Sequence, residues 1–323
     1  MHDKGYSVRE IARSLGRGKT TVNNELNRNQ VNDEYLAGKA HAKAKGRRKA
    51  ASFQGKKIVH DSRLRKFVDK ALLDGQSPDA IAGRLRAGIE SGLPYVSRPT
   101  IEEYIRSAHG RQIEYELKVL KAGQKKRRRK RRGTPERVIG DPKTYIDDRP
   151  ACITNRERVG DLEVDFIASG KQGKGYCLTA ADRKLRLGFI RKVLPVSVVE
   201  ALRALQEIKR VFPELQSIST DNDILWTYHA KLEELLDVPF YFCHPYSSWE
   251  KGGVENYNKQ ARHYVRKGSD ISQYNDAYLQ MVETKLNSRY MAVLGYQTPT
   301  EALVAYRKAE QKVSRFGTGK ANG

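Results

Sequence analysis

The chain opens with two short stretches of apolar residues at helical spacing. The first stretch consists of Val8, Ile11, Ala12 and Leu15. It begins at a Ser7–Glu10 capping box, in which each side chain can accept from the other residue's backbone N–H. Gly16 follows where a turn is needed, and Val22 and Leu26 form the second stretch. The pattern predicts a helix-turn-helix unit over residues 1–31, and the helix that normally precedes such a pair is expected to be missing. An ordinary helical hairpin is the alternative.

The polar side of the second predicted helix indicates contact with DNA. Its residues are Lys19, Thr20, Asn23, Asn24 and Asn27. The second helix of such a unit enters the major groove, where Asn pairs with adenine, and Lys and Thr contact bases or phosphates. We therefore expect these five side chains to bind DNA.

A second helical pair is expected over residues 63–108, after an alanine-rich basic connector over residues 32–62. Ser77–Pro78 is a strong helix start, with serine as the cap and proline at the first helical position. The apolar residues Ile81, Ala82 and Leu85 follow. After a glycine-containing loop, Ser97 can cap a helix that bears Thr100, Ile101, Tyr104 and Ile105. We interpret this region as a second helix-turn-helix-like unit with a longer turn.

Eight consecutive cations lie within a basic linker predicted over residues 109–154. They are Lys125, Lys126, Arg127, Arg128, Arg129, Lys130, Arg131 and Arg132. Such a run repels itself and stays extended until it meets an anion, so we expect it to bind the phosphate backbone of DNA. A nuclear-import signal and a solvated linker are the alternatives.

The second half of the chain alternates between strand-like and helix-like patterns. Strands are expected around residues 162–167, 176–181, 185–193, 215–220 and 238–243. Helices are expected over residues 198–211, 225–236, 254–265 and 277–290. This order predicts a mixed α/β domain over residues 155–310, followed by a tail over residues 311–323.

The distribution of charge indicates different roles for the two halves of the chain. The 323 residues carry a net charge of +23. Residues 1–140 hold 34 Lys and Arg against 15 Asp and Glu, whereas residues 141–323 hold 27 against 23. A basic front half predicts binding to a polyanion. Only three cysteines are present, and no apolar run approaches the roughly 18 residues of a membrane span. We expect a soluble protein of a reducing, intracellular compartment.

Three carboxylates stand at positions suited to chemistry. Asp165 lies within the first predicted strand, Asp221 ends a later strand, and Glu255 begins a helix. At about 100° per residue, Lys259, Arg262 and Arg266 fall within about 40° of Glu255 on that helix. A carboxylate site flanked by cations suits a metal ion beside a phosphate chain.

These features resemble the DDE transposases of bacterial insertion sequences, specifically the insertion-sequence-30 family. The matching segments are residues 5–12, 77–82, 160–165, 219–222, 244–256, 286–289 and 294–299. The resemblance covers most of the chain, and it implies helix-turn-helix units followed by a ribonuclease-H-like catalytic domain. It also implies that Asp165, Asp221 and Glu255, with 33 residues between the last two, form the catalytic and metal-binding triad.

The resemblance further implies an activity and its partners. The expected enzyme binds the inverted-repeat ends of a mobile element, frees 3′-hydroxyls and joins them to target DNA, using two Mg²⁺ (or Mn²⁺) ions. A homodimer or larger assembly is expected, because two ends are joined. The protein is expected in the bacterial cytoplasm, associated with the nucleoid and not with a membrane. The alternative is a non-catalytic, sequence-specific DNA-binding regulator or a decayed copy of the enzyme.

Four residues near the triad leave open questions. Glu163 is either a secondary ligand or a structural carboxylate, and Glu250 is a rival for Glu255. Trp249 is expected in the core, with stacking on an unpaired base as the alternative. Asp223 stands where the family usually has glycine. If the backbone there has a positive φ, aspartate strains the turn, and its charge crowds the metal site.

Overall fold

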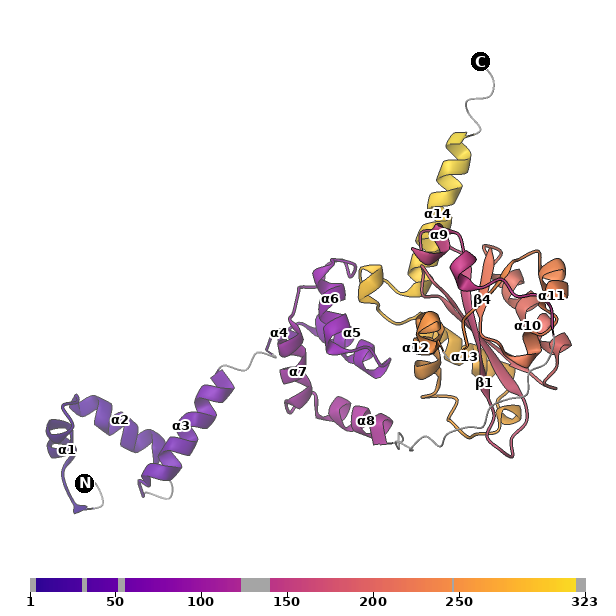
Figure 1. Ribbon diagram of the computed structural model, residues 1–323. Coiled ribbons are helices and arrows are strands. Elements are labelled where there is room, and N and C mark those ends of the chain that lie inside the picture. Colours follow the sequence, from indigo (N-terminus) through magenta and orange to yellow (C-terminus); the bar gives the residue numbers. More distant parts are fainter. Residues whose placement is uncertain (1–3, 31–33, 52–55, 123–139, 246, 318–323) are drawn as a thin grey trace.

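Three groups of elements follow one another along the chain (Figure 1). The computed structural model describes residues 4–30, 34–51, 56–122, 140–245 and 247–317. A small helical unit comes first, a second helical unit follows, and a mixed α/β domain completes the chain. Within the described ranges, no helix is long and apolar enough to cross a membrane.

The first unit consists of α1 (Val8–Ser14), α2 (Lys19–Asn29) and α3 (Ala37–Ala51). The capping box is present, because Ser7 Oγ accepts from Glu10 N and Glu10 Oε2 accepts from Ser7 N. Gly16 turns the chain with a φ of +59°. The buried residues are Ile11, Ala12, Val22 and Leu26, whereas Leu15 is 59% exposed and does not join the predicted stripe.

In the described part of the predicted connector over residues 32–62 lie α3 and α4 (Lys56–His60), and the next helix begins at Ser62. Alanine is the strongest helix former, and α3 packs against α2 through the buried Ala40. Lys43 donates to the carbonyl of Gln30, and Arg47 donates to Asn29 Oδ1 at 2.5 Å. The basic segment therefore forms the third helix of the first unit and the start of the second.

The second unit is built from α4, α5 (Ser62–Leu73), α6 (Pro78–Arg86), α7 (Arg98–Arg106) and α8 (Arg111–Ala122). Ser77 caps α6 by accepting from Ala80 N, whereas Ser97 Oγ contacts Thr100 Oγ1 rather than the helix amides. The shared core includes Ile58, Leu64, Ile81, Ile101, Tyr104 and Ile113. This core extends on both sides of the predicted range 63–108.

A five-stranded mixed sheet forms the centre of the third unit. Its strands are β1 (Asp161–Ala168), β2 (Tyr176–Asp182), β3 (Gly188–Val193), β4 (Ser217–Thr220) and β5 (Phe240–Phe242). The strand order is β3-β2-β1-β4-β5, with β1, β2 and β3 antiparallel and β1, β4 and β5 parallel. This is the ribonuclease-H-like arrangement that the family resemblance implies.

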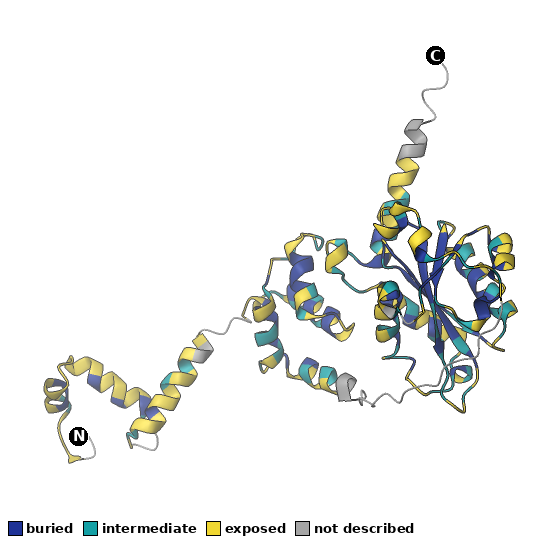
Figure 2. Ribbon diagram, viewed as in Figure 1, coloured by how far each residue is buried: buried dark blue, intermediate teal, exposed yellow. Residues whose placement is uncertain are grey.

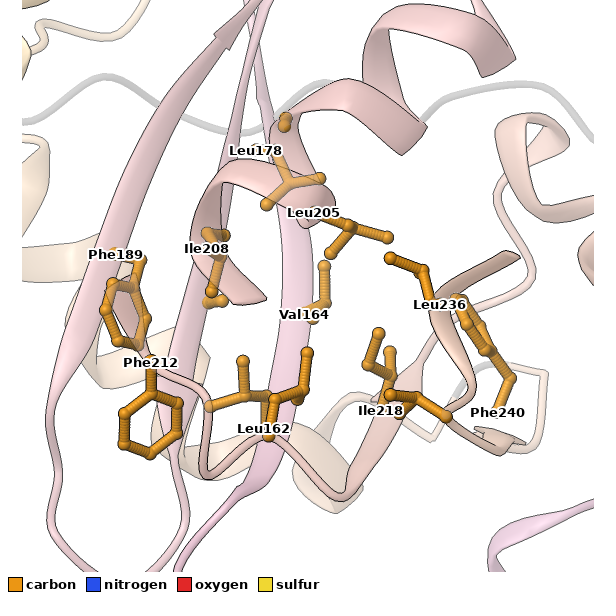
Figure 3. Close-up of a cluster of buried hydrophobic side chains, with 14 of the residues drawn as sticks. Leu162, Val164, Leu178, Phe189, Leu205, Ile208, Phe212, Ile218, Leu236 and Phe240 are labelled. Carbon is orange, nitrogen blue, oxygen red and sulfur yellow. The ribbon is translucent and has the colours of Figure 1, made fainter. Parts of the chain in front are cut away.

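Helices cover both faces of the sheet (Figure 1). On one face lie α10 (Val198–Val211) and α11 (His229–Leu236), and on the other lie α12 (Gly252–Ala261) and α13 (Asp276–Asn287). Figure 3 shows Leu162, Val164 and Leu178 of the sheet facing Leu205 and Ile208 of α10. Burying each such side chain contributes about 1.5–3 kcal/mol, and Figure 2 shows the sheet as the most buried part of the chain.

Several of the predicted helix bounds differ from the structure, and α13 ends at Asn287 rather than at residue 290. The helix expected over residues 225–236 is split into the 3-10 helix η3 (Ile224–Trp226) and α11. The helix expected over residues 254–265 ends at Ala261. A long helix, α14 (Pro299–Gly317), crosses the predicted boundary at residue 310. The remaining short elements are α9 (Ala151–Thr154), η2 (Ile146–Asp148), η4 (Ser248–Lys251), η5 (Ile271–Gln273) and η6 (Ala292–Leu294).

Candidate active site

Parallel pairing of β1 with β4 brings two predicted site residues together. Asp161 and Glu163 of β1 lie opposite Ser217 and Ser219 of β4. The same offset, continued by two residues, sets Asp165 opposite Asp221, the first residue after β4. Neighbouring strands lie about 4.8 Å apart, so both carboxylates reach the same space at the end of β4.

One ammonium group occupies the space between these carboxylates. Lys251 Nζ lies 3.2 Å from Asp165 Oδ1 and 3.1 Å from Asp221 Oδ2, and its side chain is only 6% exposed. Burial opposes the charge of Lys251, but the two carboxylates outweigh it and raise the pKa of the amine. Lys251 is therefore a cation held by two acids at the centre of the site.

Helix α12 supplies the next contacts. Asn258 Nδ2 donates to Asp165 Oδ2 at 2.7 Å, while Asn258 Oδ1 is buried and has no hydrogen-bond partner among the residues that the structure describes. Glu255 lies one turn earlier on α12 and is exposed. Within the described part of the chain, no group of three or more His, Cys, Asp or Glu side chains is arranged to hold a metal ion. The structure thus brings Asp165 and Asp221 together but does not join Glu255 to them.

The residues present nevertheless fit a divalent cation. Two carboxylates point at one position, where the ammonium of Lys251 already supplies positive charge. The orphaned oxygen of Asn258 beside Asp165 is a further acceptor. Oxygen ligands of this kind are those that Mg²⁺ and Mn²⁺ prefer.

The three cations predicted on the face of Glu255 have different surroundings. Lys259 is exposed on α12, one turn after Glu255. Arg262 is the C-cap residue and is partly buried, and this burial lowers the pKa of its guanidinium while Asp165 and Cys177 oppose the shift. Arg266 is exposed but lies beyond the end of the helix, so the helical angle predicted for it does not apply.

The expectation for Trp249 is wrong, and the condition for backbone strain at Asp223 is not met. Trp249 is 75% exposed and is not a core residue, because it lies in η4 on the outside of the domain. Asp223 has a φ of −63°, so the backbone there needs no glycine. Its carboxylate accepts from Leu225 N and caps η3. Burial raises the pKa of Asp223, and the negative charges of Asp221 and Asp165 raise it further, so the expected crowding of charge is present.

The two rival glutamates have partners of their own. Glu250 accepts from His244 N at 2.8 Å and lies 3.1 Å from His244 Nδ1. Glu163 is 1% exposed, pairs with Arg183 and accepts from the first amides of α12. The sequence left two alternatives for Glu163, a secondary ligand or a structural carboxylate. These contacts are those of a structural carboxylate.

The predicted DNA-binding residues lie far from the sheet in the sequence. Lys19, Thr20, Asn23, Asn24 and Asn27 are all exposed on α2, whose buried residues are Val22, Leu26 and Asn29. The run from Lys125 to Arg132 lies outside the described residues.

Two contact residues of the site were missed by sequence reasoning. Lys251 lies four residues before Glu255, and Asn258 lies three residues after it. Helical spacing was a signal for Asn258, since residues three apart share a face. Nothing in the sequence indicates that Lys251 turns inward between two acids.

Comparison with known proteins decides the family. The transposase for insertion sequence element IS4351 of Bacteroides fragilis is 34% identical over 91% of this chain and 89% of its own length. The transposase InsI for insertion sequence element IS30C of Escherichia coli is 30% identical over 92% of this chain and 78% of its own. The chain belongs to the insertion-sequence-30 family of transposases.

Two further comparisons concern parts of this chain. A family model described as a helix-turn-helix domain matches residues 1–29, the region of α1 and α2. The catalytic core domain of BIV integrase, a solved structure, aligns with 47% of this chain and 98% of its own, at 15% identity and a TM-score of 0.38.

Proposed function

We propose that the chain is a metal-dependent DNA transposase. It binds the inverted-repeat ends of its element, cleaves to free 3′-hydroxyls and joins them to target DNA, with Mg²⁺ or Mn²⁺ held by Asp165, Asp221 and Glu255. The observation that carries this proposal is the convergence of Asp165 and Asp221 on one buried cation position. Membership of a transposase family supports the same reaction.

The residues of the site have separate tasks in this reaction. Two bound divalent cations would supply charge stabilisation for the attacking and the leaving oxygen. Asp165 on β1 and Asp221 directly after β4 would hold the cations, and Glu255 on α12 would complete the set. Lys251 neutralises the two aspartates until the cations bind. Lys259, one turn after Glu255, then faces the phosphate chain of the substrate.

DNA is held by the basic front half in this proposal. The exposed residues of α2 read the element ends, and the cations from Lys125 to Arg132 contact the phosphate backbone without regard to sequence. Joining requires two ends in one complex, so the active form is a homodimer or a larger assembly.

A strand-cleavage assay tests the proposal. The substrate is a duplex carrying the imperfect inverted repeats that flank the coding region, with Mg²⁺ or EDTA. Wild type should cleave only with Mg²⁺. Asp165→Asn, Asp221→Asn and Glu255→Gln should lose cleavage by a factor of 100 or more and still shift the same duplex in a gel.

Glu250→Gln is the matched control for Glu255→Gln, because Glu250 is occupied by His244. It should cleave within a few-fold of wild type. Cleavage by Glu255→Gln together with loss in Glu250→Gln would reject Glu255 as the third ligand.

A DNA-binding regulator without catalysis is the second candidate. It is favoured by one observation, that Glu255 is exposed and does not join the two aspartates within the described residues. Wild type that binds the element ends and never cleaves them would select this candidate.

A further inference from the structure

Three acidic side chains alternate along one face of β1, and each has different partners. Asp161 is buried and pairs with Arg158, and Asp165 belongs to the site described above. Glu163 lies between them and is 1% exposed. Its partners come from Arg183 and from the start of α12.

Glu163 supplies the N-terminal cap that α12 otherwise lacks. The N-cap residue Lys251 makes no side-chain hydrogen bond to the helix amides, because an ammonium group has no acceptor, and its donors are directed at the aspartates. Glu163 Oε2 accepts instead from Gly253 N at 2.7 Å and from Val254 N at 3.0 Å. A carboxylate at this end satisfies free N–H groups and interacts favourably with the helix dipole.

The other carboxylate oxygen of Glu163, Oε1, is held by a buried arginine. Arg183 Nη1 donates to Glu163 Oε1 at 2.5 Å. The same guanidinium donates through Nε to the carbonyl of Ile153 at 3.1 Å, and Arg183 is 5% exposed. Both carboxylate oxygens are therefore engaged, and the side chain cannot swing away without leaving a buried arginine unpaired.

The approach of α12 to Glu163 depends on one glycine. A Cβ atom added at Gly253 would lie 2.6 Å from Glu163 Oε2, closer than real Cβ contacts allow. A Cβ atom added at the neighbouring Gly252 would meet nothing within 4 Å. Gly253 is thus in close contact with the carboxylate, and Gly252 is not.

We propose that Glu163 is a positioning residue, an inference that rests on the proposed function. By holding the first amides of α12 against β1, it sets the distance of Glu255 and Asn258 from Asp165 and Asp221. Glu163 touches neither metal nor DNA in this role. Misplacement of a reacting group by about 1 Å can lower a rate by about 100-fold, so a shift of α12 away from β1 should slow the reaction.

The two glycines provide a test that leaves Glu163 in place. In Gly253→Ala the new methyl group must displace either the Glu163 carboxylate or the start of α12, and either movement breaks the contact between them, whereas Gly252→Ala adds the same methyl group to the same turn in open space. We expect Gly253→Ala to cleave about 100-fold more slowly than wild type and to bind Mn²⁺ more weakly in calorimetry. Gly252→Ala should stay within twofold of wild type in both measurements. Equal behaviour of the two variants would overturn the proposal.

Glu163 itself is tested by amide hydrogen exchange. Glu163→Ala should lose protection at the amides of Gly253 and Val254, and Glu163→Gln, which keeps one acceptor oxygen, should retain part of it. Asp161→Asn is the control for loss of a buried acid from the same face of β1, and it should leave these two amides protected.

The outcomes separate this proposal from the proposed function. If the wild-type protein fails to cleave, the proposed transposase activity is rejected. If the amides of Gly253 and Val254 stay protected in Glu163→Ala, the positioning role of Glu163 is rejected. Loss of Mn²⁺ binding in Glu163→Ala, with normal binding in Gly253→Ala, would make Glu163 a metal ligand and overturn its positioning role.

Discussion

Arg84 of α6 and Glu301 of α14 form a bidentate ion pair although 217 positions separate them in the sequence. Arg84 Nη1 donates to Glu301 Oε2 at 2.8 Å, and Nη2 donates to Oε1 at 2.7 Å. The guanidinium also lies 4.3 Å from the centre of the Tyr290 ring. These contacts fix the second helical unit against the mixed α/β domain.

This ion pair predicts a pH dependence of stability. The hydrogen bonds from Arg84 lower the pKa of Glu301 to about 2, from an ordinary value of 4.5. A carboxyl group whose pKa is lower in the folded state stabilises that state above its unfolded pKa. The contribution is therefore complete above about pH 4.5 and is lost as the pH falls toward about 2. Since the Glu301 side chain is 41% exposed, solvent screens part of the effect.

Denaturant unfolding between pH 2 and pH 7 measures this contribution. Glu301→Gln should be less stable than wild type at pH 7, and the difference should vanish near pH 2. Glu310→Gln, which changes an exposed glutamate on the same helix, should match wild type throughout. A constant difference for Glu301→Gln at every pH would contradict the assignment.

We predict that Lys251 competes with divalent cations for Asp165 and Asp221, because its ammonium lies between them. Lys251→Met removes the ammonium, so Mn²⁺ should bind more tightly, by about tenfold or about 1.4 kcal/mol. Without metal, the same variant should lose about 1–3 kcal/mol of unfolding free energy, because two acids then face each other unpaired. Thermal unfolding with and without Mn²⁺ measures both effects. Lys259→Met, which removes a cation at an exposed position of α12, is the control. Weaker Mn²⁺ binding by Lys251→Met would reject competition between Lys251 and the metal ion.

The exposed side of α2 should decide which DNA is preferred. A bidentate Asn–adenine pair contributes about 1–3 kcal/mol of discrimination. Asn23→Ala or Asn24→Ala should therefore lower affinity for the element ends more than affinity for random DNA. Competition gel shifts measure the ratio of the two affinities. Equal losses on both DNAs would make α2 a backbone contact.

The run from Lys125 to Arg132 should control salt dependence rather than specificity. Each phosphate contact contributes about −0.9 to the slope of log affinity against log salt concentration. Replacement of all eight residues by Gln should flatten that slope by several units on any duplex. The preference for element ends should change little, since phosphate contacts carry no sequence information. An unchanged slope would leave the run as a linker.

The sequence by itself determined much of the local structure of this protein. Apolar periodicity marked α1, α2 and α10, and alternation marked β1, because these patterns reflect which face of an element is buried. The capping box at Ser7 was readable because its partners lie three residues apart. Motifs also indicated Asp165, Asp221 and Glu255. By contrast, α3 was missed because its alanines and cations show no apolar stripe.

Only the tertiary structure decided how the candidate site is held together. Lys251 reaches Asp165 across 86 positions and Glu163 reaches Gly253 across 90, distances over which no sequence period applies. A charged residue has the same one-letter code in the sequence whether it lies on the surface or is buried between two acids, as Lys251 is. Its role depends on which strands pair in parallel and which helix end packs against them. That packing is set by burial of the whole sheet, and it made Glu163 a cap and Lys251 a counterion.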